Sequence, residues 1–124
     1  APDGRPTVLY TALVHAREPQ TLMCLLKFVE TILSSAAHAS SAQSLRLVRS
    51  RRLLLLPVAN PDGYAWNAAR APRGGGMRRK NGLKTCSSTG NSPNDGVDLN
   101  RNFGHKWALD SIGSPPSGCF EGVR

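Results

Sequence analysis

Two apolar runs along the chain predict two core strands. Thr7–Val14 is a nearly continuous stretch of β-branched and apolar residues, and Leu53–Val58 has the same character. Continuous runs of this kind are typical of strands that are covered on both faces in an α/β sheet. Each run is far shorter than the roughly 20 apolar residues that a membrane-spanning helix needs. We therefore expect a buried sheet and no transmembrane segment.

The residues between these runs predict an amphipathic helix. Pro19 suits a first helical turn. Apolar residues then recur at helical spacing, with polar residues between them, at Leu22, Leu25, Leu26, Val29, Ile32 and Leu33. Strand, helix and strand in this order predict a βαβ unit.

Polar segments elsewhere predict loops. Ser34–Ser44 consists mostly of small residues and is typical of a frayed helix end or a surface loop. Asn60–Gly63 holds the residue types that favour a tight turn, so it should end the second strand. Ala71–Asn94 is polar, basic and long for a connection, which makes it functional or disordered. We expect the chain of 124 residues to form one modest domain.

The charge balance indicates a surface that attracts anions. The chain has 16 Lys and Arg residues against 8 Asp and Glu residues, and much of the excess lies in Arg46–Arg52 and Arg70–Lys84. Nucleic acid, an acidic membrane surface and a substrate carboxylate would all be attracted, and charge alone does not rank them. Because aromatic residues are not interleaved with the arginines, we rank nucleic-acid binding far behind the alternatives.

The three cysteines do not suggest a structural zinc site. Cys24, Cys86 and Cys119 are odd in number and show no Cys-x-x-Cys spacing. Cys24 falls within the apolar helical pattern, so we expect it to be buried. Cys86 and Cys119 lie in polar loop segments, and they are the pair that should bond if any pair does.

His15 and Glu18 are the first candidates for chemistry. They lie three residues apart, directly after the first predicted strand, where α/β proteins tend to place ligand sites. Neutral imidazole nitrogen and carboxylate oxygen are both zinc ligands, and a catalytic zinc site takes three protein ligands and a water molecule. Taken alone, the pair is a weak signal, and a helix-capping Glu beside a partly buried His is the simpler interpretation.

Further motifs change that interpretation. Together with His15-Ala-Arg-Glu18, the chain contains Asn60-Pro-Asp-Gly-Tyr64, Met77-Arg-Arg-Lys80 and Gly96-Val-Asp-Leu-Asn-Arg-Asn-Phe103, in this order. The series resembles the zinc metallocarboxypeptidases of the carboxypeptidase A/B type, from Thr7 to about Glu121. The resemblance implies that residues 1–124 are part of one catalytic domain. It also implies an α/β fold, an incomplete doubly wound mixed sheet flanked by helices and truncated on its C-terminal side.

The same resemblance implies zinc-dependent hydrolysis of C-terminal peptide bonds. His15 and Glu18 would be ligands of a single zinc ion, and Asp98 would orient His15. Arg79 would polarise the scissile carbonyl and stabilise its oxyanion. Outside this motif context, Asp98 would be a turn cap and Arg79 a solvated surface charge.

Substrate recognition is implied in the same way. Asn100 and Arg101 would hold the terminal carboxylate of a peptide or protein substrate, and Arg17 would line the next subsite. Cys86 with Cys119 resembles a disulfide of some family members, which favours a secreted or vesicular protein.

The resemblance also leaves the site incomplete. A third ligand, a His, and a glutamate base are expected beyond Arg124, so we expect the chain alone to be inactive and marginally stable. His38 and His105 match no ligand position and are expected to be surface histidines. The alternative is a non-catalytic carboxypeptidase-like protein that binds peptide C-termini.

Overall fold

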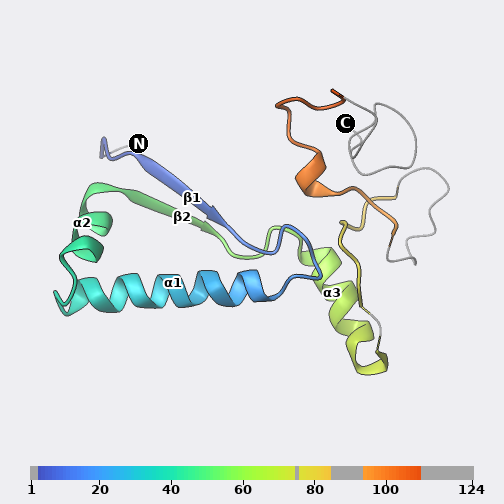
Figure 1. Cartoon of the computed structure of the whole chain (residues 1–124), viewed down its shortest axis with the longest axis horizontal. Coiled ribbons are helices and arrows are strands. Elements are labelled where there is room, and N and C mark those ends of the chain that lie inside the picture. Colours follow the sequence, from blue (N-terminus) through green and yellow to red (C-terminus); the bar gives the residue numbers. More distant parts are fainter. Residues whose placement is uncertain (1–2, 75, 85–93, 110–124) are drawn as a thin grey trace. The chain divides into compact units, whose positions relative to one another are not determined.

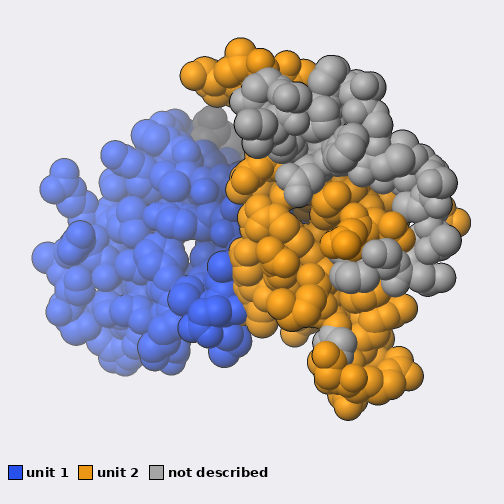
Figure 2. Space-filling model, turned by 45° about the vertical axis from the view of Figure 1, so that its right-hand side comes forward, with its two compact units in different colours: residues 1–12, 20–59 blue, residues 13–19, 60–124 orange. Residues whose placement is uncertain are grey.

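A computed structural model describes residues 3–74, 76–84 and 94–109 (Figure 1). Two compact units divide the chain, and Figure 2 shows them in separate colours. Unit 1 comprises Ala1–Ala12 and Gln20–Ala59, and unit 2 comprises Leu13–Pro19 and Asn60–Arg124. The chain therefore passes three times between the units, once on each side of Leu13–Pro19 and once between Ala59 and Asn60.

Unit 1 is built on a parallel pair of strands. Strand β1 (Thr7–Thr11) pairs with β2 (Arg52–Leu56), with Thr7 opposite Arg52 and Thr11 opposite Leu56. Ala12 N donates to Leu56 O at 3.0 Å and extends the pairing by one residue. Both predicted strands are confirmed, and their parallel direction agrees with the predicted βαβ order. The described elements are α/β, while the larger doubly wound sheet stays a prediction.

The first strand is shorter than its apolar run predicts. Leu13 has φ of 50°, in the left-handed region that residues other than glycine rarely adopt. Extended pairing cannot continue through that conformation, so β1 ends before Val14. Leu13 itself is only 1% exposed. Apolar character here reflects burial of a turn rather than continuation of the strand.

The predicted amphipathic helix is confirmed as α1 (Gln20–Ala37). In Figure 1 it runs alongside the strands, and the Phe28 and Tyr10 ring centroids are 4.8 Å apart. An apolar cavity of about 160 Å³ in unit 1 is lined by Phe28, Val29, Ile32, Leu33, Leu53 and Leu55. Leu54 and Leu56 alternate with these strand residues and are 47% and 45% exposed, and Leu55 itself is 43% exposed. Coverage of both sheet faces, as the apolar runs predict, is therefore not seen in the described residues.

Two expectations for this region were wrong. Cys24 is exposed rather than buried, because it lies outside the apolar face of α1. Residues predicted as a loop or frayed end contain the start of a second helix, α2 (Ala42–Ser50). Ser41 caps it, with Oγ accepting from Ser44 N at 3.2 Å. Serine favours both loops and helix N-caps, and here the cap prevails because Leu45 and Val48 continue a helical pattern.

Among the described residues, no single helix is long and apolar enough to cross a membrane. Taken together, α1 and α2 have the length and composition of a membrane span, but the two helices are bent by 101° at their junction.

The second part of unit 2, from Asn60, begins with a helix where a turn was expected. Asn60 Oδ1 accepts from Gly63 N at 3.1 Å and caps α3 (Pro61–Arg70), whose first helical residue is Pro61. Asn followed by Pro starts a turn or a helix equally well, and the helix forms because its first turn is packed. Two short 3-10 segments follow, η1 (Ala71–Arg73) and η2 (Leu99–Arg101).

Gly63 makes that packing possible. A Cβ atom at this position would lie 2.7 Å from each of three atoms, Ala16 Cβ, Asn60 Oδ1 and Lys80 O. Two of these belong to segments distant in sequence, so the first turn of α3 is pressed against both. Only a residue without a side chain fits there.

We expect Gly63→Ala to destabilise the protein by about 2 kcal/mol or more, because the added methyl group overpacks a contact that includes backbone. Helix propensity alone predicts the opposite sign, a gain of about 1 kcal/mol. Urea unfolding followed by circular dichroism measures the difference. Gly82→Ala is the matched control, because its Cβ would meet only Asp62 Cβ at 3.6 Å. Equal stabilities of the two variants would contradict the close packing.

Candidate functional site

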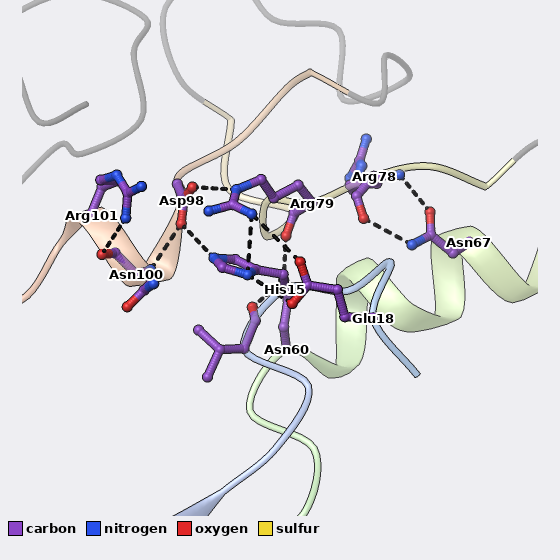
Figure 3. Close-up of polar contacts among 10 residues, drawn as sticks. His15, Glu18, Asn60, Asn67, Arg78, Arg79, Asp98, Asn100 and Arg101 are labelled. Atoms are coloured by element: carbon purple, nitrogen blue, oxygen red, sulfur yellow. Dashed lines mark hydrogen bonds and ion pairs between the residues drawn. The ribbon is translucent and has the colours of Figure 1, made fainter. Parts of the chain in front are cut away.

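His15 and Glu18 are brought together by a turn in unit 2. Glu18 N donates to His15 O at 3.1 Å, which closes the turn that follows Leu13. Their side chains lie side by side, with His15 Nδ1 3.0 Å from Glu18 Oε2 (Figure 3). The His15 side chain is 12% exposed and that of Glu18 is 42% exposed. An imidazole nitrogen and a carboxylate oxygen thus converge at the edge of the unit.

Asp98 is buried, and its carboxylate lies against His15 and Arg79. Its side chain is 1% exposed, and Oδ2 accepts from Arg79 Nε at 2.6 Å. Oδ1 accepts from Asn100 N at 2.9 Å. The same oxygen lies 3.3 Å from His15 Nε2, within ion-pair distance but without the alignment of a hydrogen bond. One carboxyl group therefore contacts three separate parts of the site.

The pKa of Asp98 reflects two opposed influences. Burial raises the pKa, because it disfavours the charged form. Hydrogen bonds from the Arg79 side chain and the Asn100 backbone, with the charges of Arg79 and His15, lower it and prevail. The net effect is a pKa below the ordinary value of 3.8, so the group is a carboxylate at neutral pH.

Arg79 supplies the positive charge that faces this group. Its Nη1 lies 3.2 Å from His15 Nδ1 and 3.6 Å from Glu18 Oε1, and the side chain is 24% exposed. In the neutral imidazole that carries its proton on Nε2, that proton faces Asp98 and the Nδ1 lone pair faces Glu18. Two electron-pair donors 3.0 Å apart then require a cation, and here a guanidinium approaches them.

His15 and Glu18 fit two positions of a zinc site. Ligand atoms that share one tetrahedral zinc at about 2.0–2.1 Å lie roughly 3.3 Å apart, close to the observed spacing. A ligating imidazole commonly turns its other nitrogen to a carboxylate, as His15 does toward Asp98. In the described part of the chain, however, no group of three or more His, Cys, Asp or Glu side chains is placed to hold a metal ion.

Asn60 joins the segments that carry these side chains, a role that the sequence did not reveal. Its Nδ2 lies 3.4 Å from both Val14 O and Arg79 O, while its Oδ1 caps α3. Ala16 N also donates to Arg79 O, at 3.2 Å. Asn60 is 2% exposed. The only sequence signal was an Asn before Pro, which we interpreted as a turn.

The predicted substrate-binding residues are exposed. Asn100 and Arg101 lie on η2, directly after Asp98, and Arg101 Nη1 donates to Asn100 O at 3.2 Å. Arg17 is exposed and lines a cavity of about 450 Å³ in unit 2, together with Pro19, Tyr64, Asn67, Ala68 and Pro72. The turn held by Asp98 thus presents an amide and a guanidinium to solvent.

The remaining histidines and cysteines were the other candidates. His38 belongs to unit 1, and its Nδ1 pairs with Ser34 O at 2.8 Å. His105 is exposed in unit 2 and joins no metal-binding group of the described residues. Cys86 and Cys119 fall outside the residues that the structure describes, so their pairing stays a prediction.

Comparisons with known proteins point in one direction. The family profile described as zinc carboxypeptidase matches residues 1–122. A zinc carboxypeptidase of Saccharothrix mutabilis subsp. capreolus is 31% identical over 85% of this chain and 22% of its own length. The carboxypeptidase N catalytic chain of Rattus norvegicus is 33% identical over 79% of this chain and 19% of its own. A protein of Uncinocarpus reesii named inactive metallocarboxypeptidase ECM14 is 30% identical over 95% of this chain and 19% of its own.

These relatives are much longer than the matched region. The chain spans about a fifth of the length of each of them. The match covers nearly all of this chain but only a small part of the relatives.

We expect Asp98→Asn to lower the free energy of unfolding by about 2–3 kcal/mol at pH 7. The substitution removes the buried negative charge that pairs with the Arg79 guanidinium. Since the pKa of Asp98 is lowered in the folded protein, its contribution is present above about pH 4 and is lost as pH falls through the folded pKa. The difference between wild type and variant should therefore shrink toward pH 3.

Urea unfolding at pH 7, 5 and 3 measures this dependence. Asp62→Asn is the control, because Asp62 is an exposed residue in the first turn of α3 and should cost less than about 1 kcal/mol. A pH-independent difference for Asp98→Asn would contradict the charged contact with Arg79.

Proposed function

Because this chain belongs to the zinc carboxypeptidase family, we propose that it carries part of a site that hydrolyses C-terminal peptide bonds with zinc and water. The observation that supports the proposal is the 3.0 Å approach of His15 Nδ1 to Glu18 Oε2, beside the Arg79 guanidinium. The chain spans about a fifth of the length of its relatives, so the activity belongs to the proposal for the whole protein.

The residues that would hold zinc are His15 and Glu18. When bound, zinc would polarise the scissile carbonyl and lower the pKa of a water molecule. Asp98 would keep the Nε2 proton of His15 directed away from the metal, leaving Nδ1 as the ligand atom. Two protein ligands do not complete a catalytic site, which needs a third.

Arg79 would stabilise the negative charge that develops on the carbonyl oxygen. Its Nε is bound to Asp98 at 2.6 Å, so the plane of the guanidinium is fixed and Nη1 is directed toward His15 and Glu18. A donor fixed before the reaction costs no reorganisation when charge appears. Asp98 would thus orient the metal ligand and the oxyanion donor together.

Recognition of the substrate would fall to the exposed residues. Asn100 and Arg101 present an amide and a planar guanidinium, which suit the terminal carboxylate of a peptide. Arg17, beside its cavity in unit 2, would contact the residue before the scissile bond. The bond from Asn100 N to Asp98 holds this turn in place.

A second candidate is a non-catalytic protein that binds peptide C-termini. One observation favours it: a relative that is aligned over 95% of this chain is named an inactive metallocarboxypeptidase. Such a protein would use Asn100 and Arg101 without hydrolysis.

We also propose an extracellular or secretory location, on the basis of the predicted bond between Cys86 and Cys119. Mass spectrometry of peptides from the unreduced protein would detect that bond.

We expect the whole protein to bind zinc and His15→Ala to weaken that binding by at least about 100-fold, because a ligand is lost. Titration calorimetry with metal analysis measures affinity and stoichiometry. His38→Ala is the matched control, since His38 lies in unit 1 and pairs with backbone. Zinc retained at full affinity by His15→Ala would exclude the proposed ligand.

We expect Arg79→Met to lower kcat/KM by about 100- to 1000-fold, the usual effect of removing one oxyanion donor. The assay is hydrolysis of an N-blocked peptide with a free C-terminus, and the amidated peptide tests recognition of the carboxylate. Arg73→Met is the control, because Arg73 is exposed and its Nη2 donates to Ala69 O, at 3.4 Å, rather than to a residue of the candidate site. A protein that binds the peptide without hydrolysing it would support the non-catalytic candidate.

A further inference from the structure

The segment that carries Arg79 has no regular secondary structure, although Arg79 itself is directed at a defined target. Residues 76–80 belong to no helix or strand. The backbone bond from Ala16 N to Arg79 O, at 3.2 Å, holds the segment on one side. Arg79 nevertheless approaches Asp98 at 2.6 Å. Asn60 Nδ2 also bonds Arg79 O, at 3.4 Å, and contacts of the neighbouring residue Arg78 further fix the backbone from which the side chain extends.

Asn67 of α3 makes two short hydrogen bonds to the backbone of Arg78, the residue before Arg79. Its Oδ1 accepts from Arg78 N at 2.8 Å, and its Nδ2 donates to Arg78 O at 2.9 Å. A side-chain amide offers one acceptor and donors on neighbouring atoms, so it pairs with Arg78 as a neighbouring strand would. Asn67 is 6% exposed, so little water competes for these bonds.

The Arg78 side chain is held by the same turn of α3. Its guanidinium carbon lies 4.4 Å from the centre of the Trp66 ring, and Arg78 is 3% exposed. Trp66 and Asn67 are adjacent, so one turn of the helix binds both the side chain and the backbone of Arg78. Figure 3 shows Arg78 beside Asn67, and Arg79 beside Asp98 and His15.

Gly76 brings the chain close enough for these bonds. A Cβ atom at Gly76 would lie 2.5 Å from Asn67 O, and its φ of 96° is in the region that favours glycine. The segment therefore passes directly over the backbone of Asn67 before Arg78 is bound.

We propose that Asn67 is a positioning residue for Arg79, fixing the Arg78 backbone so that the next guanidinium meets Asp98 and faces His15. The catalytic part of this inference rests on the proposed role of Arg79. A shift of about 1 Å in a catalytic group can lower a rate by about 100-fold, so loss of the two bonds has a measurable effect.

The first readout is kinetic and uses the zinc-loaded whole protein. Asn67→Ala lowers kcat by roughly 10- to 100-fold with KM and zinc affinity nearly unchanged. In an Arg79→Met background the same change has no further effect, because Asn67 acts through Arg79. Ser41→Ala is the control: it removes a helix cap in unit 1 and lowers stability without lowering kcat.

The second readout does not need activity. In protein labelled with [15N]arginine, the Arg79 Nε–H signal is assigned by its loss in Arg79→Met, and its solvent exchange is measured. Exchange is slow in wild type because of the bond to Asp98, and it becomes roughly 10- to 100-fold faster in Asn67→Ala, the factor that two hydrogen bonds provide. If the protein hydrolyses no peptide, the proposed function fails while this measurement still tests the positioning.

Equal exchange rates in wild type and Asn67→Ala would overturn the proposal, whatever happens to kcat. Should Asn67→Ala not fold, Asn67→Asp keeps the shape and the acceptor for Arg78 N and replaces the donor to Arg78 O with a carboxylate oxygen. We expect Asn67→Asp also to speed the solvent exchange of Arg79 Nε–H, by a smaller factor. An unchanged exchange rate in this variant would again overturn the proposal.

Discussion

The burial of one carboxylate, that of Asp98, is the constraint on which unit 2 depends. A charge that is only 1% exposed would cost several kcal/mol without partners. Arg79 Nε, Asn100 N and the imidazole of His15 supply them. Each comes from a different segment, so the segments must meet at Asp98 for the charge to be tolerated. The same contacts bring the Arg79 guanidinium and the His15 imidazole together. They therefore both stabilise unit 2 and arrange the candidate site.

Side-chain amides replace a sheet in holding these segments together. Asn81 also binds backbone through its side-chain amide, because its Oδ1 accepts from Val97 N at 2.9 Å and Leu83 N at 3.0 Å. Val97 precedes Asp98, so this amide fixes the approach of the buried carboxylate. Gly96 allows the close contact with Asn81 O that a side chain would prevent, and its φ is 104°. Asparagine and glycine recur together because one supplies the bonds and the other the space.

Unit 1 follows simpler rules, and its elements were predictable. Continuous apolar runs located β1 and β2, and apolar residues at helical spacing located α1, because these patterns are local in the sequence. The helices α2 and α3 were missed because Ser41 and Asn60 belong to residue types that begin loops and helices alike. Local sequence does not distinguish the two outcomes, whereas the packing of the following turn does.

The sequence by itself determined the family, the two strands with their connecting helix, and the residues of the candidate site. It did so because motifs such as Gly96–Phe103 preserve residue types in order, and residue type fixes what a side chain can bind. Only the tertiary structure decided that Asp98 contacts Arg79 as well as His15, and that Asn60 and Asn67 bond the backbone of Arg78 and Arg79. These contacts join residues that are far apart in the chain, and no local pattern specifies the distance between such residues once the chain has folded.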